Sequence, residues 1–308
     1  MTAGNRAASS AGGSIYDLGY RHYEGKRNGR RYAVWSLYVE SFRSVWGFGR
    51  PVRSKAAPLI IAGLFAFPAI VQLALSSVLL QQIQNGEQVT LFKYSDYFER
   101  FGFFMILFCV AQAPELVCRD QRYQVLPLYF TRALGRVDYA VARFAALATA
   151  LFVALLVPMI ALFVGDVLMK PDTLAAIGTE WPKALPSIPA CALIGLGMGA
   201  ISLSLSAFSP RRAYSAIGLV AYFLIMEAVP TAIFAIGHSG SADWTWSDKL
   251  VLLTPITSLS SAVRWFFGAR VDTGLPTTLG SFDYVLAAIV STVLFTGILI
   301  FRYRRISA

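Results

Sequence analysis

The sequence predicts an all-α membrane protein with six transmembrane helices, an N-terminal amphipathic interfacial helix and short re-entrant helices before the last span. Three observations support this fold class. Of the 308 residues, 56% are hydrophobic and only 14% are charged, whereas soluble domains carry about a quarter charged residues. The mean hydropathy of +0.58 is too high for a fold that must present a polar surface to water. The apolar residues are gathered in long blocks, and most basic residues lie in the segments between and around these blocks that would face the same side of a membrane.

Residues 1–30 are expected to form a disordered cytoplasmic segment. The first part of this segment, 1–14, is rich in Gly, Ala and Ser, and no apolar run begins before about residue 56. A cleavable signal peptide would need an apolar run close to the start of the chain. We therefore expect no signal peptide, and we expect residues 31–308 to form a single transmembrane domain.

Residues 31–49 predict a helix with one aromatic face. Trp35, Tyr38, Phe42 and Trp46 recur at helical spacing, while Glu40 falls elsewhere on the helix. A helix of this kind is expected to lie in the membrane interface with its aromatic face toward the lipid. The alternative is an ordinary helix whose aromatic face packs on the rest of the protein.

Six apolar blocks are long enough to cross about 30 Å of hydrocarbon, which takes about 20 residues of helix. They lie at about 56–80, 99–118, 142–165, 186–208, 213–237 and 282–301. Between the last two blocks, residues 243–281 contain an apolar stretch that Pro255 interrupts. We expect one or two short re-entrant or surface helices there, with a folded external loop as the alternative.

The distribution of arginine and lysine predicts the orientation. Most of the 27 basic residues precede the first block, lie in the 119–143 connection, stand at Arg211 and Arg212, or follow the last block. With six spans, all of these positions face the same side, which the positive-inside rule assigns to the cytoplasm. We therefore expect a multi-pass protein of the cell membrane with both termini cytoplasmic. The net charge of +10 is then explained by basic residues that face anionic lipid and cytoplasmic partners, without nucleic acid.

The motifs of common catalytic sites are missing from the sequence. The three cysteines and two histidines do not occur at metal-ligand spacing, so no metal site is expected. There is no Gly-rich phosphate loop of the G-x-x-x-x-G-K-[ST] kind, so the chain is not expected to bind ATP in that manner. We expect no catalytic residues and no cofactor held by this chain, and hence not an enzyme.

The connection 114–144 is the most informative segment. Glu115, Arg119, Asp120 and Arg122 cluster where the second span ends, and the short apolar stretch VLPLYF follows them. A surface helix with apolar side chains and flanking charges is typical of a docking element for a partner. The alternative is a lipid-facing loop that its arginines hold at the membrane surface.

The run RDQRYQVLPLYFTRALGRVDYAVARFAA, at 119–146, resembles the stretch between the second and third helices of ATP-binding cassette (ABC) type-2 transporter permeases. The likeness extends in outline over about 30–305, although Tyr123-Gln124-Val125 stands where a commoner family pattern has Gly-Thr-Leu. In that family this stretch forms a coupling helix on the ATP-binding subunit. The resemblance therefore implies a coupling contact at Arg119, Asp120, Arg122, Leu126, Leu128, Tyr129 and Arg132.

The resemblance implies the permease subunit of an exporter for a hydrophobic or amphipathic substrate. ATP and Mg would be bound by separate ATP-binding subunits, two copies of which are expected, and a second permease chain would complete the pathway. Membrane lipid is a further expected partner, and nucleic acid is not. The alternatives are a channel or scaffold subunit without ATP coupling and a membrane-embedded enzyme.

Polar side chains inside the spans are candidates for a substrate path or a dimer interface. Glu227 lies near the middle of the fifth block, and Gln72 and Ser76 lie in the first. A carboxylate at that depth is costly, so Glu227 should face the bundle interior or a cavity. The alternative is that Glu227 only bonds a neighbouring helix.

Gly195 and Gly199 form a small-x-x-x-small step, which predicts close approach of another helix.

Overall fold

The structure is a computed structural model. It describes residues 25, 28–48, 60, 63–67, 69–71, 73–75, 94–100, 102–131, 134–170, 172–239, 246–269 and 279–305. Within these ranges the secondary structure is helical, without a strand, and five helices are long and apolar enough to cross a membrane. The chain is therefore an all-α protein with the helices of a multi-pass membrane protein.

The long helices correspond to five of the six predicted blocks. They are α4 (Gly102–Arg122), α6 (Arg136–Leu168), α8 (Ser187–Ser206), α9 (Arg212–Ser239) and α12 (Ser281–Arg305). Of the predicted first block, the structure describes only parts, which belong to a shorter apolar helix, Gly63–Leu75. The total of six spans therefore stays a prediction.

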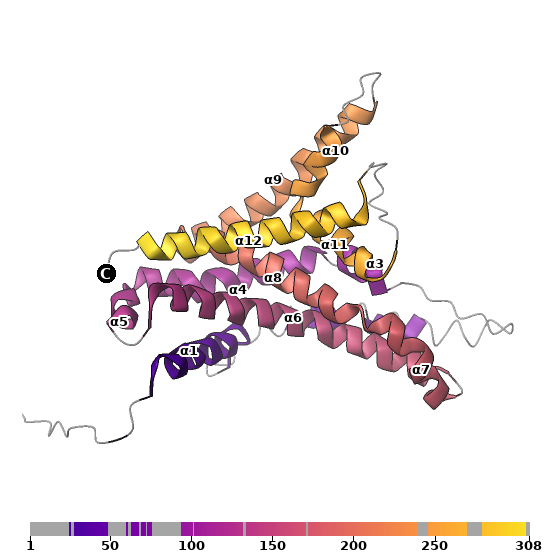
Figure 1. Cartoon of the computed structure of the whole chain (residues 1–308), viewed down its shortest axis with the longest axis horizontal. Helices are drawn as coiled ribbons and strands as arrows, with labels where there is room; N and C mark the ends of the chain where they lie inside the picture. The colour runs from indigo at the N-terminus through magenta and orange to yellow at the C-terminus, as the bar shows by residue number, and fades with distance from the viewer. Residues whose placement is uncertain are drawn as a thin grey trace, which may run out of the picture.

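Most of the shorter helices lie at the two ends of the bundle, whereas α1 (Arg30–Val45) lies alongside α6 (Figure 1). The others are α3 (Tyr94–Arg100), α5 (Leu126–Phe130), α7 (Thr173–Ala184), α10 (Ser247–Leu250), the 3₁₀-helix η1 (Val251–Leu253) and α11 (Pro255–Phe266). Figure 1 shows α5 and the end of α12 together at one end, and α3, α7, α10 and α11 toward the other. We call the first the arginine-rich end, because Arg119, Arg122, Arg211, Arg212 and Arg302 lie there, and we call the second the far end.

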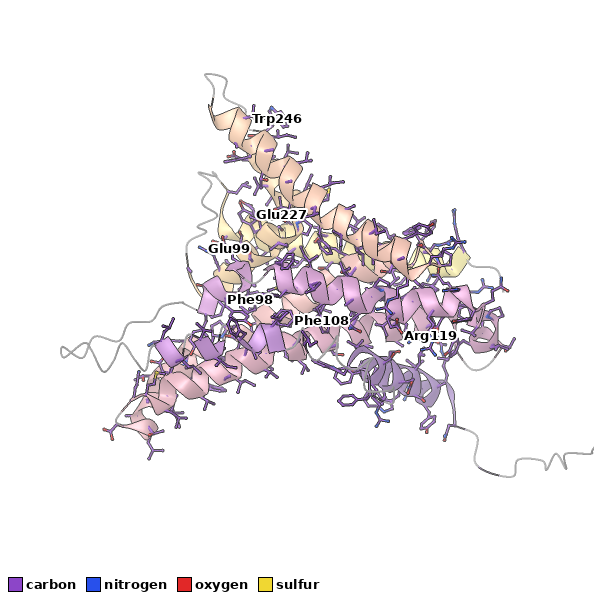
Figure 2. All side chains as sticks on the ribbon, turned by 180° about the vertical axis from the view of Figure 1, so that it is seen from behind. Phe98, Glu99, Phe108, Arg119, Glu227 and Trp246 are labelled. Carbon is purple, nitrogen blue, oxygen red and sulfur yellow. The ribbon has the colours of Figure 1, made fainter. Side chains whose placement is uncertain are left out.

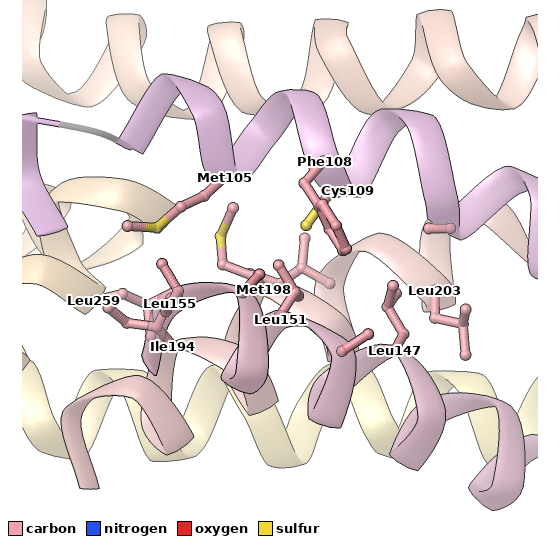
Figure 3. Close-up of a cluster of buried hydrophobic side chains, with 14 of the residues drawn as sticks. Met105, Phe108, Cys109, Leu147, Leu151, Leu155, Ile194, Met198, Leu203 and Leu259 are labelled. Carbon is pink, nitrogen blue, oxygen red and sulfur yellow. The ribbon is translucent and has the colours of Figure 1, made fainter. Parts of the chain in front are cut away.

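The core forms where α8 packs against α6, α4 and α12. A Cβ on Gly195 would lie 2.8 Å from the carbonyl oxygen of Ala148 in α6, which confirms the close approach expected at this glycine. Figure 3 shows side chains of α4, among them Met105 and Phe108, facing α6 and α8. These side chains are buried and apolar, so the interior is tightly packed and dry in this layer.

The outer faces of α9 and α12 are apolar and uncovered. On α9 the exposed side chains include Ile217, Leu224, Ile225 and Ile236. On α12 they include Leu286, Val290, Val293, Leu294 and Phe301. Apolar side chains on the outside of a long helix are what a lipid-facing surface requires, so both helices fit the periphery of a membrane domain.

The segment before α12 folds as a helical hairpin. The segment formed by α10 and η1 packs on α9. The chain then reverses direction, and α11 packs among α3, α8 and α12. At the C-terminal part of α11, Arg264 pairs with Glu99 of α3 at 2.5 Å. The short helices expected in 243–281 are thus present in its described part, and their re-entrant placement in a bilayer stays a prediction.

Candidate functional site

The end of α4 turns sharply into α5 through a defined backbone motif. The amide of Val125 donates to the carbonyl of Asp120 (3.1 Å), and the amide of Gln124 donates to that of Gln121 (3.2 Å). With Gln124 in the left-handed region at φ 53°, this is a Schellman helix end. Proline at the start of α5 suits a first helical turn. The sequence thus stops α4 and starts α5 within three residues.

A buried ionic network holds this turn to α6. Arg143 Nη2 pairs with Asp120 Oδ2, and the hydroxyl of Tyr139 donates to the same oxygen at 2.6 Å. Arg143 Nη1 also donates to Ser41 Oγ of α1 at 3.0 Å. Both charged side chains are nearly enclosed, with 12% exposure for Asp120 and 8% for Arg143. Because a buried charge is tolerated only when paired, these residues fix α4, α6 and α1 relative to one another.

An aromatic cluster extends the network to α5 and α12. The ring of Tyr139 lies 5.1 Å from that of Tyr303 in α12 and 5.7 Å from that of Tyr129 in α5. Arg143 lies over the Tyr139 ring at 5.2 Å, a cation–π geometry. Gln121 Nε2 donates to the carbonyl of Ala207, after α8, at 3.0 Å. The helices α1, α4, α6 and α12 and the end of α8 therefore meet next to α5.

The predicted coupling residues divide into an outward and an inward set. Arg119 and Arg122 are exposed, as is Leu128 at 67%, and Figure 2 shows Arg119 near the arginine-rich end. Leu126 is buried at 5% and Tyr129 is half-buried. Asp120 belongs to the inward set through Arg143, so it anchors the turn rather than facing a partner.

The predicted contact residue Arg132 lies outside the described residues, as do Gln72 and Ser76 of the predicted substrate path. The outward surface of Arg119, Arg122 and Leu128 is what the described part of the chain offers to a partner. We call it the α5 surface.

The aromatic helix α1 packs on the protein. Its buried face is Leu37, Ser41 and Val45, and these contact α6 and α4. Tyr38 donates to Thr149 Oγ1 of α6 at 3.1 Å, and the Trp46 ring meets the Phe108 ring edge-on at 6.1 Å.

The four predicted interfacial side chains of α1 therefore differ in their surroundings. Tyr38, Phe42 and Trp46 are half-buried at the edge of the protein contact, whereas Trp35 is 62% exposed. For three of the four, the alternative of packing on the protein describes the structure better than a face turned to lipid. An aromatic stripe on a helix reports an apolar neighbour without distinguishing lipid from protein.

The N-terminus of α1 is tied to α6 by an ion pair. Arg30 pairs with Asp138 at 2.6 Å, and Asp138 also accepts the amide of Gly135 at 3.0 Å. The hydrogen bond to the Asp138 carboxylate raises the pKa of the Arg30 guanidinium further above its usual value. An acidic residue in the first turn of α6 also suits the helix dipole.

Glu227 bonds a neighbouring helix in the described structure. Its two carboxylate oxygens accept the amides of Ile256 and Thr257, each at 3.1 Å, and the hydroxyl of Thr257. These amides belong to the first turn of α11, whose donors have no partner within the helix. Glu227 is therefore the N-terminal cap of α11, supplied from α9, and Figure 2 shows it part-way along α9, well away from Arg119.

Sequence reasoning did not single out Arg143 and Tyr139 as functional residues. A signal was present, because Arg143 stands at the very start of an apolar block and needs a buried partner there. The partner, Asp120, is 23 positions away and reaches it only when α4 and α6 pack.

No three His, Cys, Asp or Glu side chains among the described residues converge in a way that would hold a metal ion. Cys109, Cys118 and Cys191 are free and buried.

Comparison with models of known protein families finds no match, and none of the curated proteins matches the chain.

Proposed function

We propose that this chain is the membrane-spanning permease subunit of an ATP-binding cassette transporter that exports a hydrophobic or amphipathic substrate. Separate subunits would bind ATP and Mg and hydrolyse the ATP. The observation that carries the proposal is the α5 surface, in which the exposed Leu128 of the short helix α5 lies beside the exposed Arg119 and Arg122 at the end of α4. A buried network holds this surface to the rest of the protein. The resemblance of 114–144 to the coupling segment of such permeases supports the same assignment.

The mounting of α5 suits the transmission of force. Asp120, at the base of the turn, is bonded to α6, and the Tyr129 ring of α5 packs against the Tyr139 ring of α6 in a tilted arrangement. A push on the exposed Leu128 would therefore move α4 and α6 together rather than bend a flexible loop. Coupling in such machines requires an element of this kind, which biases a two-state arrangement of helices.

The remaining parts fit the same proposal. Both termini and the α5 surface would face the cytoplasm of a cell membrane protein with six spans, and α10–η1–α11 would enter the bilayer from the outside. The uncovered faces of α9 and α12 would contact lipid and a second permease chain. Glu227 would control how α9 sits against α11 along the substrate path.

The test is purification of the chain from its native membranes, followed by assay of the material for ATP hydrolysis and for a polypeptide with an ATP-binding motif. The proposal predicts that wild type brings down such a subunit and that Leu128→Asp loses it at least tenfold while the chain still inserts. The control is Leu174→Asp in α7 at the far end, where the leucine is 87% exposed against 67% for Leu128. A purified chain with no ATP-hydrolysing partner would instead support a channel or scaffold.

A further inference from the structure

Beside the α5 surface, two adjoining hollows lie between the end of α4 and the start of α9. The first has a volume of about 900 Å³ and the second about 1020 Å³, and Arg122, Pro210 and Arg212 line both of them. They open at the arginine-rich end. Their size is in the range of sites that hold a small-molecule head group.

Among the described residues, the second hollow is lined by basic side chains and by no acidic one. Arg122 and Arg211 have no acidic partner among the described residues, and they lie over the rings of Tyr123 and Tyr214 at 5.9 and 5.6 Å. Arg212 is different, since it pairs with Glu115 at 2.8 Å. Two guanidinium groups therefore lie over aromatic rings, and no carboxylate among the described residues accepts their hydrogen bonds.

An exposed apolar stripe leads away from this hollow along α9. Ala213, which lines the hollow, is followed at helical spacing by Ile217, Val220 and Leu224. All four side chains are exposed, Ile217 at 65% and Leu224 at 60%. A ligand with its anionic group between the arginines could thus lay an apolar chain along α9 without leaving the protein surface.

We propose that the second hollow binds the phosphate of an anionic phospholipid, with Arg122 and Arg211 on the phosphate and an acyl chain along α9. Guanidinium groups form paired hydrogen bonds with phosphate oxygens, and basic pockets beside membrane helices select anionic head groups. The apolar stripe favours a lipid over a soluble phosphate. The site depends only on the membrane location of the chain, so it stands or falls separately from the ATP-binding partner.

The test uses the purified full-length chain alone in detergent, titrated with phosphatidylglycerol or phosphatidylcholine of identical acyl chains. Bound lipid is counted by native mass spectrometry, and thermal unfolding is followed in parallel. Wild type should bind phosphatidylglycerol in preference and unfold at a higher temperature with it. Arg122→Gln with Arg211→Gln should weaken that binding about tenfold or more, since each basic residue near an anionic lipid contributes about fivefold.

Two further variants make the result specific. Arg122→Lys with Arg211→Lys keeps the charges and should retain most of the preference, and Arg31→Gln with Arg43→Gln removes two exposed arginines of α1 and should change nothing. Equal binding of the two lipids by wild type would overturn the proposal, as would an unchanged preference in the Arg122/Arg211 glutamine variant. Equal stabilisation by glycerol phosphate at the same concentration would show a soluble-phosphate site and overturn the lipid assignment.

Discussion

The two ends of the bundle join their helices in different ways. At the arginine-rich end, Asp120, Arg143 and Tyr139 form one continuous buried network that ties α4, α6 and α1, and rings extend it to α5 and α12. Toward the far end the bonds are separate: Arg264 of α11 pairs with Glu99 of α3, and α9 holds the first turn of α11 through the carboxylate of Glu227. The first joint is shared among several side chains of different helices, whereas the joint between α9 and α11 has one carboxylate as its acceptor.

The difference suggests a division of labour within the proposed permease. A rigid joint transmits a displacement imposed at α5, and a joint made by one side chain lets α9 change its position against α11 at small cost. The buried bonds of the two regions therefore predict different responses to mutation, which the following substitutions test in order of expected size.

The largest effect is expected from breaking the Asp120–Arg143 pair. Asp120→Ala leaves a buried guanidinium without its carboxylate, which should lower the free energy of unfolding by about 3–5 kcal/mol. The measurement is denaturant unfolding in detergent. Asp120→Leu combined with Arg143→Met removes both charges and should recover most of the loss. If the losses of the single changes simply added in the double variant, the network would not hold this end together.

A smaller effect is expected at the joint between α9 and α11. Glu227→Ala leaves two amides of α11 without an acceptor, which should cost about 1–3 kcal/mol, and Thr257→Val should cost about 1 kcal/mol by removing one donor. Hydrogen exchange should then rise in α11 but stay unchanged at the α5 turn. Thr231→Val is the control, because its hydroxyl bonds only carbonyls of its own helix. Equal loss of protection at both ends would contradict the separation of the two joints.

The smallest effect is expected at the turn between α4 and α5. Gln124 adopts a left-handed backbone that glycine adopts without strain, so Gln124→Gly should stabilise the chain by about 0.5–1 kcal/mol. Tyr123→Gly, one residue earlier and at the helix end itself, should destabilise it. The thermal midpoints of the two variants should therefore move in opposite directions. A lower midpoint for Gln124→Gly would show that this turn is not strained in wild type.

The long helices could be predicted from the sequence because each depends on local composition. The blocks at 142–165 and 213–237 appear as α6 and α9, with ends that differ by a few residues. α6 begins earlier than predicted, at Arg136, because its charged first turn extends out of the apolar block. The helix α7 was not predicted, because Thr173–Ala184 lies between two apolar blocks. Its Glu180 pairs with Lys170, just after α6, and with Lys183 of the same helix.

The candidate site was predictable only in part. The composition of 114–144 indicates a docking helix, and Leu128 is exposed as such a helix requires. The inward role of Asp120 was not predictable, because its partner comes from another helix and only packing brings the two together. For Glu227, a bond to a neighbouring helix was one of the two alternatives, but its partners, the amides at the start of α11, depend on where the turn before α11 falls. Local patterns specify which segments are helical, whereas the pairing of distant charges depends on the tertiary arrangement.

The claim that α5 is the docking surface for an ATP-binding subunit is tested most directly by a photo-reactive amino acid placed at position 128 or 126 of the same short helix. Leu128 faces outward and Leu126 is buried, so the two probes differ in direction but hardly in location. We predict that illumination in native membranes joins position 128 to an ATP-hydrolysing polypeptide and that position 126 yields crosslinks within the chain. No such crosslink from position 128 in a preparation that hydrolyses ATP, or equal crosslinking from both positions, would contradict the account.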